Sequence, residues 1–137
     1  MISPSLAARL RAGGLRWSPQ RGDRFMLPGK DMDEDVFIVS DMTIQVHEFP
    51  GGRVIGFNGT TEWALDSVQQ QEAVWLPSET QLREKLGAAF RRLERDGSAY
   101  RVAIEVAGRS SQFEHDDPAQ AYGLALLFLI TGERVAA

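Results

Sequence analysis

The sequence predicts an α+β fold, in which a single antiparallel sheet, made of a β-meander and a C-terminal hairpin, packs against two long helices and a short N-terminal helix. Helix starts with capping residues and short segments of alternating apolar and polar residues support this prediction. The strands do not alternate with helices as in a parallel sheet, which favours antiparallel pairing. No linker or repeat divides the sequence, so residues 1–137 are expected to form one domain.

The first element is a short helix near the amino terminus. Ser3 is the expected N-cap and Pro4 the first helical residue, where a missing amide hydrogen costs nothing. The apolar stripe of this helix consists of Ile2, Leu6 and Leu10. A pair of glycines then ends it, and a turn-rich stretch follows with a short strand at residues 25–27.

The middle of the sequence indicates β-structure. Residues 36–39 form an apolar, β-branched run that is typical of a buried strand. A three-stranded meander is expected next, with strands at residues 43–49, 53–57 and 60–65 and an Asn-Gly turn at residues 58–59. Residues 67–75 fit a strand, a helix or a loop equally well.

The first long helix is expected from Ser78 to about Arg95. Ser78 and Gln81 match a capping box, in which two side chains bond to amides at the helix start. The stripe of this helix consists of Leu82, Leu86, Phe90 and Leu93, so one face is expected to be buried.

A hairpin and a last helix complete the sequence. Residues 100–106 alternate cleanly, Gly108 turns the chain, and residues 111–115 return with Phe113 inward. The last helix, residues 118 to about 131, has Asp117 as N-cap and Gln120 as the partner in a second capping box. It is apolar nearly all round, which predicts that other elements cover it on several sides.

Composition excludes several classes of function. The sequence has no cysteine, so thiol chemistry, disulfides and cysteine zinc sites are excluded. The amino terminus lacks the pattern of a secretory signal, and a cytoplasmic location is expected. The longest apolar run, residues 124–130, is far below the roughly 20 residues that span a membrane, so no membrane partner is expected.

The charges are unevenly distributed along the sequence. Residues 1–30 carry a net charge of +5, residues 31–79 carry −9, and residues 80–137 are balanced. Phosphate binding needs clustered cations, so the acidic middle argues against a nucleic-acid partner. The two charged stretches are expected to compensate each other in part.

Segments spread over most of the chain resemble one known pattern. These segments are Trp17, residues 22–25, 35–37, 40–43, 53–61 and 63–68, together with Leu76, Pro77, Gln81, Leu82, Phe90, Leu93, residues 117–119 and Ala121. In this combination the chain resembles a family of small actinobacterial proteins of unknown function, some of which carry the label pilus assembly protein CpaE.

Pilus assembly proteins of the CpaE type resemble large ATPases whose phosphate loop ends in Gly-Lys-Thr or Gly-Lys-Ser. The nearest segment here, residues 28–31, reads Pro-Gly-Lys-Asp and lacks the hydroxyl residue after the lysine. The resemblance therefore implies no nucleotide site, and it supplies no functional residue to carry over.

No catalytic motif is present in the sequence. His47 lies beside Glu48, and His115 lies beside two aspartates, but neither histidine belongs to the His-Glu-x-x-His spacing that places two imidazoles on one helix face. Asp116 and Asp117 are expected to cap the last helix. One alternative hypothesis is a small metal-dependent hydrolase built from His47, Glu48 and His115, and another is a small-molecule-binding module.

The tryptophans give the best indication of a binding surface. Core packing, or a lid over the sheet, is the more common role of such large aromatic residues. The alternative is an aromatic and arginine hot spot for a partner protein. Its candidate residues are Arg16, Trp17, Arg21, Trp63 and Trp75. We therefore expect a small, non-enzymatic binding protein that needs no cofactor and acts on another protein.

Overall fold

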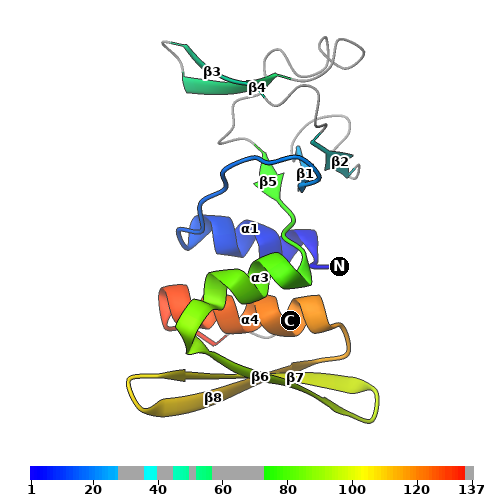
Figure 1. Ribbon diagram of the computed structural model, residues 1–137, viewed down its shortest axis with the longest axis vertical. Helices are drawn as coiled ribbons and strands as arrows, with labels where there is room; N and C mark the ends of the chain where they lie inside the picture. The colour runs from blue at the N-terminus through cyan, green and yellow to red at the C-terminus, as the bar shows by residue number, and fades with distance from the viewer. Residues whose placement is uncertain (28–35, 40–44, 50–51, 57–72, 135–137) are drawn as a thin grey trace. The chain divides into compact units, whose positions relative to one another are not determined.

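The computed structural model describes residues 1–27, 36–39, 45–49, 52–56 and 73–134 (Figure 1). The chain divides into two compact units. Unit 1 contains Met1–Arg16 and Pro77–Ala137, and unit 2 contains Trp17–Leu76. Unit 2 is thus an insertion, in sequence, between two parts of unit 1.

Unit 1 contains the three α-helices of the described residues. They are α1 (Pro4–Ala12), α3 (Glu79–Leu86) and α4 (Pro118–Thr131). Ser3 and Ser78 cap α1 and α3 as predicted, and the capping box at Ser78 is complete. None of the described helices is both long enough and apolar enough to cross a membrane.

The sheet of unit 1 is an antiparallel meander. It consists of β6 (Phe90–Asp96), β7 (Ala99–Val106) and β8 (Arg109–His115), in that order across the sheet. Helix α4 contacts β7, β8, α1 and α3, so it lies between the sheet and the other helices (Figure 1). The predicted hairpin, the inward Phe113 and the covered last helix are confirmed.

The predicted helix from Ser78 to Arg95 is wrong in its second half. Helix α3 ends at Leu86, because the next residue, Gly87, has a positive φ of 56° that stops the helical repeat. A single 3₁₀ turn, η2 (Gly87–Ala89), leads into β6. Leu93, assigned by its spacing to the buried helix stripe, lies on β6 and is 38% exposed.

The prediction of a single sheet is also wrong. In unit 2, β1 (Arg24–Met26) pairs with β2 (Phe37–Ile38) on one side and β5 (Val74–Trp75) on the other. Strands β3 (Gln45–Phe49) and β4 (Gly52–Gly56) form a separate hairpin. The C-terminal hairpin gains β6 as its third strand instead of joining these, so the meander and the hairpin belong to different sheets.

Two of the sequence predictions for unit 2 fall partly outside the described residues. The third meander strand, at residues 60–65, and the Asn-Gly turn before it lie outside them. Of residues 67–75, the last two form β5, and residues 67–72 also lie outside.

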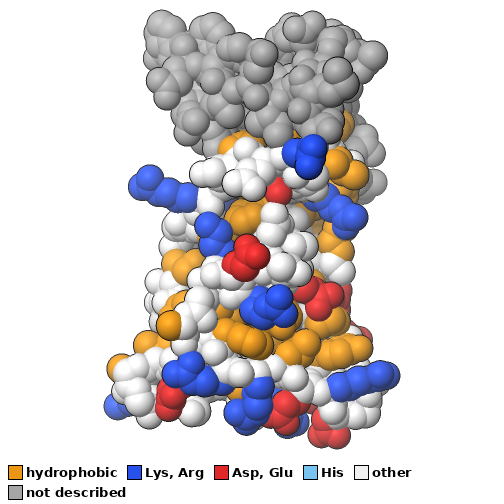
Figure 2. All heavy atoms as spheres, viewed as in Figure 1, with side chains coloured by type: hydrophobic (Ala, Val, Ile, Leu, Met, Phe, Trp, Pro, Cys, Tyr) orange, Lys and Arg blue, Asp and Glu red, His pale blue; other side chains and the backbone are white. Residues whose placement is uncertain are grey.

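The buried side chains of the unit 1 sheet lie mainly on one of its faces. The opposite face carries both basic and acidic side chains. Figure 2 shows basic and acidic side chains interspersed at the lower end of the view, where this sheet lies. The ion pairs join Arg91 to Glu105, Arg92 to Glu94, and Arg101 to Asp96 and Glu114. Pairs this exposed contribute little to stability, and the arrangement is typical of a solvated face.

Helices α1 and α4 approach each other closely at Gly123. A Cβ atom at this position would lie 2.7 Å from Cδ2 of Leu6 and 3.1 Å from Cδ1 of Ile2. Both side chains are buried, with 4% and 1% of their surface exposed, so they have little room to move aside. The missing side chain of Gly123 therefore lets the two helices pack.

We expect Gly123→Val to lower the free energy of unfolding by about 1–3 kcal/mol, because it overpacks the α1–α4 contact. Valine is a better helix former than glycine, so propensity alone predicts the opposite sign. Ala8→Val, at an exposed position of α1, is the control and should cost less than about 0.7 kcal/mol. Urea unfolding of both variants tests this, and equal costs would contradict it.

Candidate functional site

A row of aromatic side chains crosses the three-stranded sheet of unit 2. Phe25 lies opposite Phe37 on one side and opposite Trp75 on the other, so the three residues share one face. The rings of Phe25 and Phe37 are stacked, with centroids 5.5 Å apart. Phe25 is fully buried, and Trp75 is 9% exposed.

Trp17 lies against this row and contacts two aromatic rings and one carboxylate. Its ring centroid is 5.4 Å from that of Phe25 and 6.5 Å from that of Trp75, to which it is nearly parallel. Its indole nitrogen donates a hydrogen bond of 2.9 Å to Oδ2 of Asp23. We call Trp17, Asp23, Phe25, Phe37 and Trp75 the Trp17 cluster. Trp17 itself is only half-buried, so a tryptophan fixed in orientation remains partly in contact with solvent.

Asp23 anchors the turn that leads into β1. Its carboxylate also accepts a 3.0 Å hydrogen bond from the backbone amide of Gln20. Asp23 is only 5% exposed, whereas the residues on either side of it are exposed. Its backbone carbonyl accepts a 2.9 Å hydrogen bond from the amide of Val39, the residue that follows β2. Asp23 thus couples the orientation of Trp17 to the sheet.

The structure brings together only some of the residues predicted to bind a partner. Trp17 and Trp75 stack on each other, as described above, and Arg21 is exposed in the same unit. Arg16 is exposed and is the last residue of the first segment of unit 1. Trp63 lies outside the described residues. Sequence reasoning missed Asp23, Phe25 and Phe37 as residues of this site.

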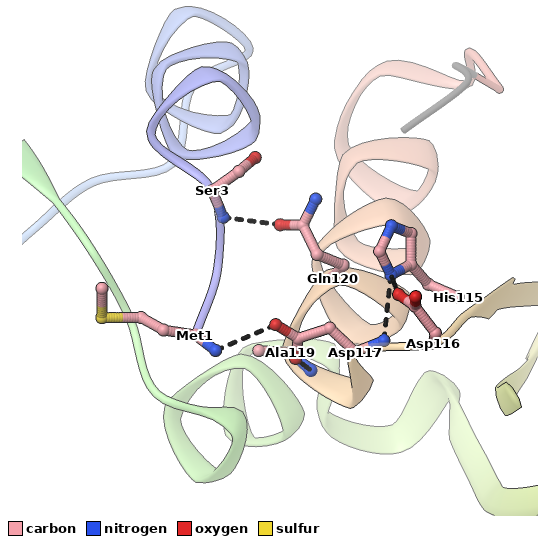
Figure 3. A network of polar contacts seen from close by, with 7 residues as sticks. All are labelled: Met1, Ser3, His115, Asp116, Asp117, Ala119 and Gln120. Carbon is pink, nitrogen blue, oxygen red and sulfur yellow. Dashed lines mark hydrogen bonds and ion pairs between the residues drawn. The ribbon is translucent and has the colours of Figure 1, made fainter. Parts of the chain in front are cut away.

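A second concentration of polar contacts lies at the start of α4 (Figure 3). Oδ1 of Asp117 accepts a 2.9 Å hydrogen bond from the amide of Ala119, as expected of an N-cap. Oδ2 of Asp117 lies 2.9 Å from the ammonium group of Met1. Asp117 therefore joins the cap of α4 to the segment that precedes α1.

Gln120 does not complete the predicted capping box. Its Oε1 atom instead accepts a 2.6 Å hydrogen bond from the amide of Ser3. The amide of Asp117, which Gln120 was expected to bind, donates to Nδ1 of His115 at 3.0 Å. The predicted capping box is wrong because Gln120 binds Ser3, which is distant in sequence. His115 accepts the hydrogen bond from the Asp117 amide in its place.

These contacts lower the pKa of Asp117. Partial burial on its own raises this pKa, but the hydrogen bonds from the Met1 ammonium and from the Ala119 amide, with the charges of the ammonium and of His115, outweigh that effect. The folded-state pKa therefore lies below the ordinary value of 3.8.

The residues of the alternative hydrolase hypothesis belong to different units. His47 and Glu48 are in β3 of unit 2, where the structure describes only the backbone, and His115 is at the end of β8 in unit 1. Within the described part of the chain, no three histidine or carboxylate side chains gather in a way that could hold a metal ion. The hydrolase hypothesis stays an untested prediction.

Comparison of the chain with protein-family models, with curated proteins and with solved structures finds no match. The resemblance to small actinobacterial proteins accordingly stays a prediction.

We expect Asp117→Ala to lower the free energy of unfolding by about 0.5–2 kcal/mol near pH 7, because it removes an N-cap. Asp117→Asn should cost less, because its amide oxygen still accepts from Ala119 while the ion pair to Met1 is lost. Because the pKa of Asp117 is lowered on folding, its carboxylate stabilises the folded state fully when the pH is above 3.8, the ordinary value of this pKa. This stabilisation is lost as the pH falls through the lowered pKa.

The pH dependence of Asp117→Asn provides the check. Urea unfolding of the wild type and of this variant, measured from about pH 7 to about pH 2.5, should give a difference that shrinks once the pH falls below 3.8. A difference that stays constant over this range would contradict the role of the charge.

Proposed function

We propose that the protein is a non-enzymatic binding protein that recognises another protein through Trp17 and through arginines close to it in the sequence. The observation that carries the proposal is the state of Trp17, which is half-buried yet held by the rings of Phe25 and Trp75 and by the carboxylate of Asp23. The proposed site needs no cofactor. The cysteine-free composition is consistent with a cytoplasmic location, which we also propose.

A fixed tryptophan suits the centre of a protein interface. Tryptophan and arginine are among the residues that contribute most to binding energy when a partner covers them. A side chain already held in one orientation loses little conformational entropy on binding. Ordinary core packing would also bury the faces of Trp17 against Phe25 and Trp75, but it gives no reason for the surface that stays exposed.

The surrounding charge favours an acidic partner surface. Arg21, four residues after Trp17, is exposed in unit 2, and Arg16 directly precedes Trp17 in the chain. Charges of one sign around an interface chiefly increase the rate of association with a partner of opposite charge, and they disfavour partners of the same sign. The proposed partner therefore carries an apolar or aromatic contact within an acidic rim.

We expect Trp17→Ala to weaken binding of the partner by about thirtyfold or more, the loss that defines an interface hot spot. Replacing Arg16 and Arg21 together by glutamate should weaken it independently, since the rim then repels acidic groups. Quantitative capture from a lysate of the producing cells, with the purified chain as bait, measures both effects.

The matched control replaces Arg83 and Arg109, which are exposed in unit 1, by glutamate. This control changes the net charge by the same amount as the reversal of Arg16 and Arg21. Circular dichroism and thermal unfolding establish that each variant is folded. A protein that is retained by the control and lost from both test variants supports the proposal. Identical captured proteins for all four chains would contradict it.

A further inference from the structure

The ring nitrogen Nδ1 of His115 has two polar neighbours, one a hydrogen-bond donor and the other an acceptor (Figure 3). The backbone amide of Asp117 lies 3.0 Å away and is a donor. Oδ1 of Asp116 lies 2.9 Å away and, as a carboxylate oxygen, is an acceptor. An imidazole nitrogen carries either a lone pair or a proton, so Nδ1 can bond to only one of these neighbours at a time.

We propose that His115 is a proton-controlled switch at the junction of β8 and α4, in which Nδ1 accepts from the Asp117 amide when it is unprotonated and donates to Asp116 when it is protonated. Histidine is the side chain whose charge ordinarily changes between about pH 5 and 8.

The two states leave different groups unsatisfied. In the unprotonated state the Asp116 carboxylate loses the ring as a partner, but its side chain is 81% exposed and water can bind it. In the protonated state an ion pair forms with Asp116, while the Asp117 amide faces an N–H group and loses its acceptor. Because this amide is partly buried, the protonated state favours a movement of the backbone at Asp117.

Movement at Asp117 would reach the amino-terminal segment. The same residue holds the Met1 ammonium and caps α4, and Gln120, one turn further on, holds the amide of Ser3. Protonation of His115 is therefore expected to loosen the segment before α1 from the start of α4, since these two contacts join them.

The other charged and titratable groups around His115 are few in the described part of unit 1. Tyr100 lies opposite His115 on β7, and the guanidinium of Arg95 on β6 lies 5.7 Å from the centroid of the Tyr100 ring. On α4 the neighbouring group is Asp117, which is paired with the Met1 ammonium. Asp116 is the carboxylate in direct contact with the ring and thus the main acceptor for a protonated Nδ1.

Nuclear magnetic resonance of the isotopically labelled full chain tests the proposal between pH 5 and 8. The imidazole nitrogen shifts report whether Nδ1 of His115 carries a proton, and His47 is the internal reference. We expect Nδ1 to be unprotonated at pH 8. On acidification the Asp117 amide shift should change with the same midpoint as the ring. Its protection from hydrogen exchange should fall about two- to twelvefold, the effect of losing one hydrogen bond.

Two variants separate the switch from a simple loss of structure. In His115→Asn the side-chain oxygen can accept from the amide two residues later, so the fold is retained and the pH response of the Asp117 amide should disappear. In Asp116→Asn the response should remain, but its midpoint should move to lower pH, because the carboxylate that favours the charged ring is gone.

Two results would overturn the proposal. One is a proton on Nδ1 of His115 already at pH 8, which would mean that the ring donates to Asp116 throughout. The other is an Asp117 amide whose shift and protection do not follow the titration of His115 in the wild type, or follow the same course in His115→Asn.

Discussion

Helix α4 has no polar face, and unit 1 is arranged to cover it. Its residues 119–127 are all buried, and α1, α3, β7 and β8 all contact it. A helix that is apolar all round is stable only inside a protein, so the remaining elements of this unit are placed by the need to enclose it. Apart from the hydroxyl of Tyr122, its polar side chains lie near its ends, where Asp117 caps the first turn and Gly132, with a positive φ of 77°, ends the last. The contacts to Met1 and Ser3 belong to this same arrangement.

The sequence predicted best those features that depend on neighbouring residues. The caps Ser3, Ser78 and Asp117 were all located, because a cap needs only its own turn. The β6 strand was missed because Leu86, Phe90 and Leu93 have helical spacing, and pairing with β7 overrides this local preference. The glycine at position 87 was the available signal for the end of α3. The number of sheets depends on which strands meet in space, and spacing in sequence does not contain that information.

In the candidate site, too, features set by neighbouring residues were predicted better than those set by contacts between distant segments. Trp17 and Trp75 were selected for their size and for the arginines near them, but nothing in their 58-residue separation indicates that they stack. Their contact depends on the register that places Phe25 opposite Trp75, a property of pairing between distant segments. Asp23 gave one local signal, as an aspartate in a turn, which is a common position for a side chain that bonds back to the chain. Gln120 was misassigned for a similar reason, since its partner Ser3 is remote in sequence.

The division of unit 1 into two segments has a consequence for how the chain is made. The hydrogen bond between Ser3 and Gln120 can form only after the 117 residues that follow Ser3 have been synthesised. At a synthesis rate of about 5–20 residues per second, this delay is roughly 6–23 seconds. During that time the apolar stripe of α1 lacks α4, the helix that covers it, and all of unit 2 has been synthesised by the time α4 follows. The insertion thus gives unit 2 the first opportunity to fold, and unit 1 can close only after α4 has been synthesised.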